Sequence, residues 1–80
     1  MTITALLFAS YADVLQRERV ELTLPLGATV RDALAHLRAL PGGAQLPPAP
    51  LVAVNLEYAR TDAVLAPGDE LAVIPPVAGG

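Results

Sequence analysis

The 80-residue sequence has no cysteine, no lysine and a single histidine, His36. The lack of cysteine excludes disulfide bonds, thiolate nucleophiles, iron–sulfur ligation and zinc sites built from thiolates. One histidine cannot supply two imidazole ligands to a metal, and no serine or threonine stands near it in sequence as an obvious nucleophile. We therefore expect no metal site, no bound cofactor and no self-contained active site.

Positive charge is also scarce. The five cationic side chains are all arginines scattered among eight carboxylates, and the net charge is −3. No basic stripe is present to hold a phosphate backbone, so we expect no nucleic-acid partner. The longest apolar stretch near the start, residues 5–9, is far below the roughly 18–20 residues of a membrane span, and no charged segment precedes it. We expect a cytoplasmic protein without a membrane partner.

The sequence does contain enough apolar material for one small fold. Its hydrophobic fraction of 54% is too high for intrinsic disorder, and 80 residues are too few for two cores. At roughly 0.05–0.15 kcal/mol per residue, the free energy of unfolding would be about 4–12 kcal/mol. Because this margin is modest, we expect function on a surface or at an end of the chain.

The hydrophobic pattern predicts five strands and one long helix. Strands are expected over residues 2–9, 20–24, 51–55, 57–60 and 70–74. Thr29 and Asp32 have the spacing of a capping box, and apolar residues recur behind them at helical spacing as far as Leu40. That helix leaves His36 on its solvated face. Residues 10–15 suit a loop or one helical turn, and the proline-rich residues 44–50 suit an irregular surface connection.

This order of elements predicts an α+β fold of the β-grasp type, with a mixed sheet of four to five strands packed on one main helix. We assign residues 1–74 to this domain and residues 75–80 to an extended C-terminal tail.

One helix covers only one face of such a sheet. Alternation along the strands places Leu6, Phe8, Tyr58 and Ile74 on the other face, pointing away from the helix. The sequence therefore predicts an exposed apolar face, and such a face on a small domain often marks a partner surface.

The tail has an unusual composition for a chain end. Pro75 and Pro76 have no N–H to donate to a strand ladder, and their fixed φ favours a stiff, extended exit from the sheet. Six residues at ~3.3–3.6 Å each span up to roughly 20 Å, enough to enter a cleft in another protein. Gly79 and Gly80 lack Cβ atoms, so they fit a narrow channel.

Five short segments along the chain carry a family resemblance. They are LFA at residues 7–9, LPLGATV at 24–30, VAVN at 52–55, PGDE at 67–70 and, most specifically, IPPVAGG at 74–80. In these segments the chain resembles the ubiquitin-like sulfur carriers, most closely the small subunits of molybdopterin synthase, over nearly its whole length.

The resemblance implies that chemistry occurs at Gly80. In this family a separate ubiquitin-activating-like adenylyltransferase uses ATP to convert the C-terminal carboxylate into an acyl-adenylate, and sulfur from a donor protein turns that group into a thiocarboxylate. The tail that carries the thiocarboxylate then enters the large subunit of the synthase, within a heterotetramer. Its sulfur passes there to cyclic pyranopterin monophosphate. The resemblance thus makes the chain a non-catalytic small subunit, with tail-insertion residues Pro75, Pro76, Val77, Ala78 and Gly79.

The same resemblance implies that the exposed apolar face binds partner proteins. We expect Phe8, Tyr58 and Ile74 to contact both the activating enzyme and the large subunit. One departure from the family bears on the fold: Leu56 follows Asn55 where family members often carry glycine, and leucine resists the positive φ of such a turn.

Other functions stay open. A sulfur carrier for thiazole, cysteine or tungsten-pterin synthesis would share the same chemistry, although the double proline before the end favours the pterin branch. A ubiquitin-like modifier would be joined through Gly80 to lysines of target proteins. A β-grasp interaction module would have no chemistry at its terminus.

Overall fold

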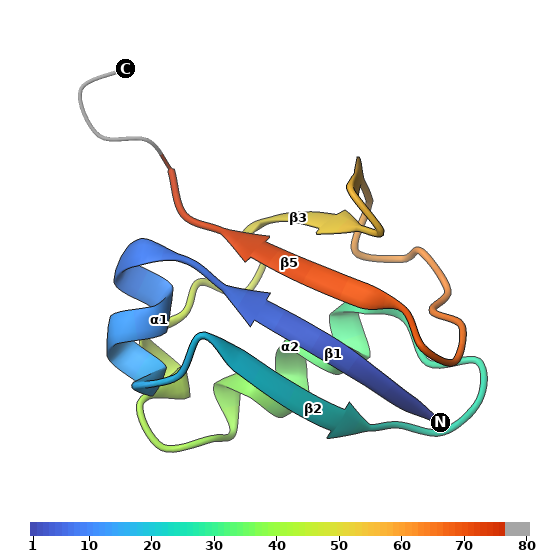
Figure 1. The fold of residues 1–80 in the computed structure, drawn as a ribbon, viewed down its shortest axis with the longest axis horizontal. Coiled ribbons are helices and arrows are strands. Elements are labelled where there is room, and N and C mark those ends of the chain that lie inside the picture. Colours follow the sequence, from blue (N-terminus) through green and yellow to red (C-terminus); the bar gives the residue numbers. More distant parts are fainter. Residues whose placement is uncertain (77–80) are drawn as a thin grey trace.

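The computed structural model describes residues 1–76, in which five strands form a single sheet (Figure 1). The sheet order is β2-β1-β5-β3-β4, with β1 and β5 parallel and all other neighbours antiparallel. The predicted mixed sheet is therefore confirmed. The elements in chain order are β1 (Thr2–Leu7), α1 (Ala9–Leu15), β2 (Arg19–Thr23), α2 (Val30–Arg38), the 3-10 helix η1 (Gly43–Gln45), β3 (Leu51–Val54), β4 (Glu57–Tyr58) and β5 (Glu70–Ile74).

Helix α2 covers one face of the sheet, as predicted, and begins with the capping box. Thr29 Oγ1 accepts a hydrogen bond from the Asp32 backbone N–H at 3.3 Å, and Asp32 Oδ2 accepts one from the Thr29 backbone N–H at 2.9 Å. The bond from the Thr29 backbone N–H and a second one, donated by the Thr29 hydroxyl to Asp32 Oδ2 at 3.2 Å, lower the pKa of the Asp32 carboxyl below its ordinary value of 3.8. The apolar stripe of α2 packs on the strands, and its buried residues are Val30, Ala33, Leu34 and Leu37.

Residues 9–15 form a second helix of seven residues, which excludes the expected loop and is longer than the one helical turn that was the alternative. Ala9 has a φ of +47°, so the chain turns sharply out of β1 there, and the strand ends at Leu7 instead of continuing to residue 9 as predicted. Tyr11 and Leu15 lie one helical turn apart and are both buried against the core. Their four-residue spacing was a signal for a helix, but the segment is too short for periodicity alone to decide.

The proline-rich connection between α2 and β3 was predicted to be an irregular surface segment, and this is wrong in part. It begins with η1, and Leu46 directly after η1 is 2% exposed and belongs to the core. Arg38 Nε donates to the Leu46 carbonyl oxygen at 3.0 Å, which ties the connection to α2. A single leucine among prolines carries no periodic signal, so only the tertiary structure assigns it to the core.

The turn between β3 and β4 adopts the conformation that leucine disfavours. Asn55 has a φ of +50° and Leu56 a φ of +72°, the pattern of a type I′ hairpin turn. The Asn55 side chain holds the turn against the start of β5: its Oδ1 accepts from the Glu70 N–H at 3.0 Å, and its Nδ2 donates to Asp69 Oδ1 at 2.9 Å. These contacts offset the strain at Leu56, which is 92% exposed.

Candidate functional site

The sheet face that turns away from α2 is apolar toward the ends of β1 and β5, and we call this region the outer face. Toward the starts of these strands the same side is polar, because Thr4 pairs there with Glu21 and Glu70. Along β1, Ile3, Ala5 and Leu7 are buried on the α2 side, so Leu6 projects to the other side. Strand pairing carries this side across the sheet, because directly paired residues project to the same face. The outer face comprises Leu6, Phe8, Leu51, Ala53, Tyr58, Ala72 and Ile74.

Register places these residues in two rows. Leu6 pairs with Ala72, Ala72 with Ala53, and Ala53 with Tyr58, which makes one row across four strands. Ile74 pairs with Leu51 in the second row. The structure thus brings the three predicted contact residues, Phe8, Tyr58 and Ile74, onto one face, with Phe8 at the end of β1 and Tyr58 on the edge strand.

The outer face is open to solvent although it is apolar. Phe8 is 46% exposed, Leu51 52% and Tyr58 77%. Leu51 was not among the predicted contact residues, because its strand is apolar on consecutive positions and does not reveal from sequence which residue faces outward. Arg19, which pairs with Leu6, supplies charge at the β2 edge of the face.

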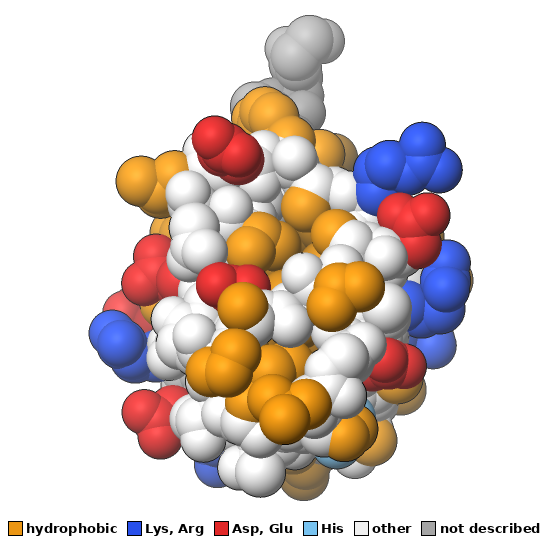
Figure 2. Space-filling model, turned by 90° about the vertical axis from the view of Figure 1, so that its right-hand side faces the viewer, with side chains coloured by type: hydrophobic (Ala, Val, Ile, Leu, Met, Phe, Trp, Pro, Cys, Tyr) orange, Lys and Arg blue, Asp and Glu red, His pale blue; other side chains and the backbone are white. Residues whose placement is uncertain are grey.

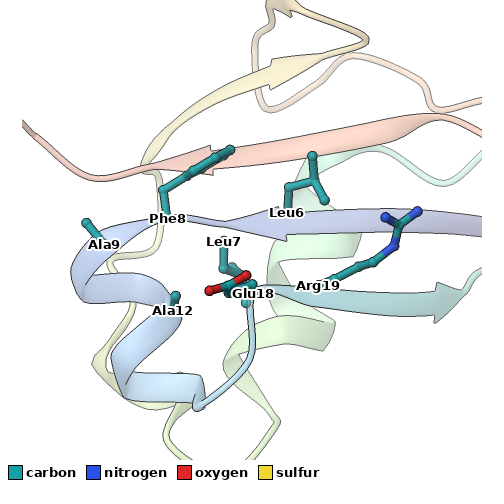
Figure 3. Close-up of a pocket in the computed structure, with 7 residues that line it drawn as sticks. All are labelled: Leu6, Leu7, Phe8, Ala9, Ala12, Glu18 and Arg19. Atoms are coloured by element: carbon teal, nitrogen blue, oxygen red, sulfur yellow. The ribbon is translucent and has the colours of Figure 1, made fainter.

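A recess of about 450 Å³ lies where the outer face meets α1 (Figure 3). Figure 3 shows Leu6 and Phe8 projecting to one side of β1 and Leu7 to the other. Glu18 and Arg19 add one acidic and one basic group to an otherwise apolar lining. Sequence reasoning missed this recess because α1, which supplies Ala9 and Ala12 to it, was not predicted.

The tail leaves the domain beside the outer face. β5 ends at Ile74, next to the end of β1, and Pro75 and Pro76 follow without strand pairing. Pro75 is partly buried and Pro76 is exposed. The remaining predicted tail residues, Val77, Ala78, Gly79 and Gly80, lie outside the described residues.

The titratable side chains of residues 1–76 give no sign of a metal site. In this range no group of three or more histidine, aspartate or glutamate residues is placed to hold a metal ion. The lowered pKa of Asp32 has a structural cause in the helix cap, and His36 lies exposed on α2. No helix of the described part of the chain has the length and apolarity needed to span a membrane.

A second exposed apolar group lies at the other end of the sheet, where β1 begins. The segments before α2 and before β5 meet there, with the Leu65 N–H donating to the Ala28 carbonyl at 2.8 Å. Leu26 is 77% exposed and Val64 68%. Figure 2 views this end and shows hydrophobic side chains over its centre, with basic side chains at the edges and acidic side chains both at the edges and among the hydrophobic ones. Only the outer face, however, borders the exit of the tail.

Known proteins are similar to this chain in both sequence and fold. The chain is 33% identical over 79 residues to the molybdopterin synthase sulfur carrier subunit of Arabidopsis thaliana, covering 98% of this chain and 82% of the relative. The structure is similar to that of SAMP1, small archaeal modifier protein 1, from Haloferax volcanii, with a TM-score of 0.87, 32% identity and full coverage of both chains. It also resembles molybdopterin converting factor, subunit 1, from Pyrococcus furiosus, with a TM-score of 0.83, 25% identity and coverage of 96% of this chain and 99% of that one.

These similarities confirm the predicted β-grasp fold and the family resemblance found in the five sequence segments. Residues 5–80 match the ThiS family, a range that includes every strand except the start of β1. The chain therefore belongs to the ThiS family.

Proposed function

We propose that this protein is the sulfur carrier subunit of a molybdopterin synthase and holds its sulfur on the carboxyl group of Gly80. The observation that carries the proposal is the position of the tail exit. β5 delivers Pro75 and Pro76 at the border of an exposed apolar face, so a partner that covers this face also receives the tail. The 33% identity to the Arabidopsis sulfur carrier subunit supports the same assignment.

Acyl substitution explains why a backbone carboxylate serves in a chain without thiols. A carboxylate resists nucleophiles because it is resonance-stabilised and negatively charged. A separate adenylyltransferase joins it to the α-phosphate of ATP and releases pyrophosphate, which gives an acyl-adenylate with a good leaving group. Hydrosulfide delivered by a sulfur donor protein then attacks the carbonyl carbon, AMP leaves with its oxygen, and a proton is released. The product is the thiocarboxylate of Gly80.

The tail sequence suits delivery of that thiocarboxylate into a partner. The two prolines hold the exit extended, and Gly79 and Gly80 have no Cβ to obstruct a narrow channel. In the large synthase subunit the thiocarboxylate sulfur passes to cyclic pyranopterin monophosphate, and the catalytic side chains belong to that subunit. The outer face docks first on the activating enzyme and later on the large subunit.

Mass spectrometry of the intact protein tests the proposal. Incubation with the activating enzyme, ATP and a sulfur donor is expected to raise the mass by about 16 Da, the difference between sulfur and oxygen. A variant that lacks Gly79 and Gly80 is the matched control, and the same incubation is expected to leave its mass unchanged. Its circular dichroism spectrum should remain that of the folded protein. An unchanged mass of the full-length protein, with enzyme and donor active on another carrier, would contradict the proposal.

A second candidate function is protein modification, which the similarity to small archaeal modifier protein 1 favours. The same acyl-adenylate would then be attacked by a lysine amine of a target, forming an amide and releasing AMP. The two functions differ in their products. Amide-linked conjugates with target proteins would support the modifier, whereas a thiocarboxylate consumed by the large subunit supports the sulfur carrier.

A further inference from the structure

A shallow pocket on the helix side of the sheet has a different chemistry from the outer face. It has a volume of about 380 Å³ and is formed by α2, by the segment before β3 and by the segment after β4. The lining residues are Arg31, Ala35, Arg38, Pro48, Ala49 and Thr61. We call it the arginine pocket.

Hydrogen bonds orient both guanidinium groups of the arginine pocket. Arg31 Nη2 donates to Thr61 Oγ1 at 3.3 Å, and the Arg31 backbone N–H donates to the Thr61 carbonyl at 2.8 Å. Arg38 Nε donates to the Leu46 carbonyl at 3.0 Å. Each guanidinium carries five N–H donors, so most of them stay available to a ligand in the pocket.

The arginine pocket differs from the surroundings of the other three arginines. Arg60 forms an ion pair with Asp62 at 3.4 Å, and Arg17 and Arg19 line recesses that also contain Glu18. Arg17 also lines a recess without a carboxylate, but it is the single cation there, whereas the arginine pocket has two. No carboxylate lines the arginine pocket. The neighbouring acid, Asp32, makes its hydrogen bonds with the Thr29 backbone N–H and hydroxyl, and the charge of Arg31 adds only a smaller contribution to its lowered pKa. The pocket is thus a local positive site on a chain of net charge −3.

We propose that the arginine pocket binds a carboxylate side chain in an acidic segment of a partner protein. A planar guanidinium fork matches a carboxylate, and Ala35, Pro48 and Ala49 provide apolar walls for the methylene groups that carry it. Two arginines are too few to hold a nucleic-acid backbone. A small free anion would leave the pocket open to water, where such contacts are weak, whereas a protein segment covers the walls and excludes water.

This site is independent of the proposed function, because it uses neither the tail nor the outer face. Its arginines lie on α2, which packs on the opposite side of the sheet from Phe8 and Tyr58. An acidic segment therefore docks here while another partner occupies the outer face.

Titration of the ¹⁵N-labelled full-length protein by NMR tests the proposal. The probe is a synthetic peptide of alternating glutamate and alanine, and its control has glutamine in place of glutamate. We expect saturable shifts at the backbone amides of Ala49 and Thr61 and at the Nε signals of Arg31 and Arg38, only with the acidic peptide. Added salt is expected to weaken the binding.

Paired variants locate the site. Arg31→Gln leaves the Arg38 contact to Leu46 intact and is expected to weaken binding about two- to fivefold, and Arg31→Gln combined with Arg38→Gln about tenfold. Arg17→Gln combined with Arg19→Gln makes the same change in net charge and is expected to leave binding within about twofold of wild type. Thermal unfolding checks that each variant is folded.

Several results would overturn the proposal. They are the absence of a saturable shift, equal shifts with the glutamine peptide, and equal weakening by the Arg17 and Arg19 variants. Inorganic phosphate serves as a further probe. If it binds at these residues as tightly as the acidic peptide, the pocket is a site for small anions and the proposed protein segment is wrong.

Discussion

The inner and outer faces of the sheet come from the same strands and have similar apolar side chains, yet they differ in what covers them. On β5, Leu71 and Val73 are fully buried beneath α2, while Ala72 and Ile74 on the other side stay partly exposed. The same alternation separates buried Leu7, the last residue of β1, from exposed Phe8 directly after it. Residue type therefore does not distinguish the core from the partner surface in this protein. The two faces differ in whether another element of the fold covers them.

The largest expected effect lies on the inner face. Leu71→Ala removes a fully buried side chain and is expected to lower the free energy of unfolding by about 2–5 kcal/mol, because it leaves a cavity under α2. Leu51→Ala on the outer face is the matched change, and we expect a loss below about 1 kcal/mol because that side chain is already half in water. Urea unfolding followed by circular dichroism measures both. Equal losses would show that the outer face is structural core.

A substitution on the outer face is expected to weaken partner binding rather than to lower the free energy of unfolding. Phe8→Asp places a charge in the apolar face and should weaken binding to the activating enzyme and to the large subunit at least about tenfold. Phe8 is the N-cap residue of α1, a position that favours aspartate, so the fold should be retained. Leu26→Asp, at the exposed apolar group at the other end, is the control. Wild-type binding of Phe8→Asp to both partners would exclude the outer face as their docking surface.

The β3–β4 turn offers a smaller effect that belongs to neither face. Leu56→Gly is expected to raise the free energy of unfolding by about 0.5–1 kcal/mol, because glycine adopts the positive φ without strain and the exposed leucine contributes no burial. Leu56→Ala removes the same side-chain bulk but keeps a Cβ, so no comparable gain should appear. Chemical denaturation compares the two variants. A gain with alanine equal to that with glycine would contradict backbone strain as the cause.

The smallest effect concerns the cap that starts the covering helix. The pKa of Asp32 is lowered by its hydrogen bonds with Thr29, so the folded protein binds the Asp32 proton less readily than the unfolded chain does. The stabilisation is complete above the ordinary pKa of 3.8 and is lost as pH falls through the lower folded value. Asp32→Asn should therefore be less stable than wild type near neutral pH, with the difference shrinking in acid. Melting temperatures measured across this range would contradict the assignment if the difference were constant.

The parts of the fold that could be predicted from the sequence are those with a signal in neighbouring residues. Alternation located the buried residues of β1, β2 and β5, and the spacing of Thr29 and Asp32 located the start of α2. Helix α1 and the burial of Leu46 could not be predicted, because each depends on one or two apolar residues whose burial is set by distant parts of the chain.

The candidate site shows the same division. Phe8 and Ile74 were predicted from strand alternation and Pro75 to Gly80 from composition, and these residues carry the resemblance that the comparisons confirm as family membership. The recess beside α1, the outward direction of Leu51 and the arginine pocket required the structure. Arg31 and Arg38 share α2, but Thr61 follows β4 and Pro48 and Ala49 precede β3, and no spacing within one segment predicts that these three segments meet.

The sequence by itself determined the alternating strands, the capped helix and the composition of the tail, because these depend on neighbours within a few residues. Only the tertiary structure decided which apolar face is covered. That outcome depends on strand order, on register and on the placement of α2, which are set by long-range packing. The absence of cysteine from the sequence excludes thiol side-chain chemistry, whereas only the fold places the end of β5, from which Pro75 and Pro76 leave, beside an open surface.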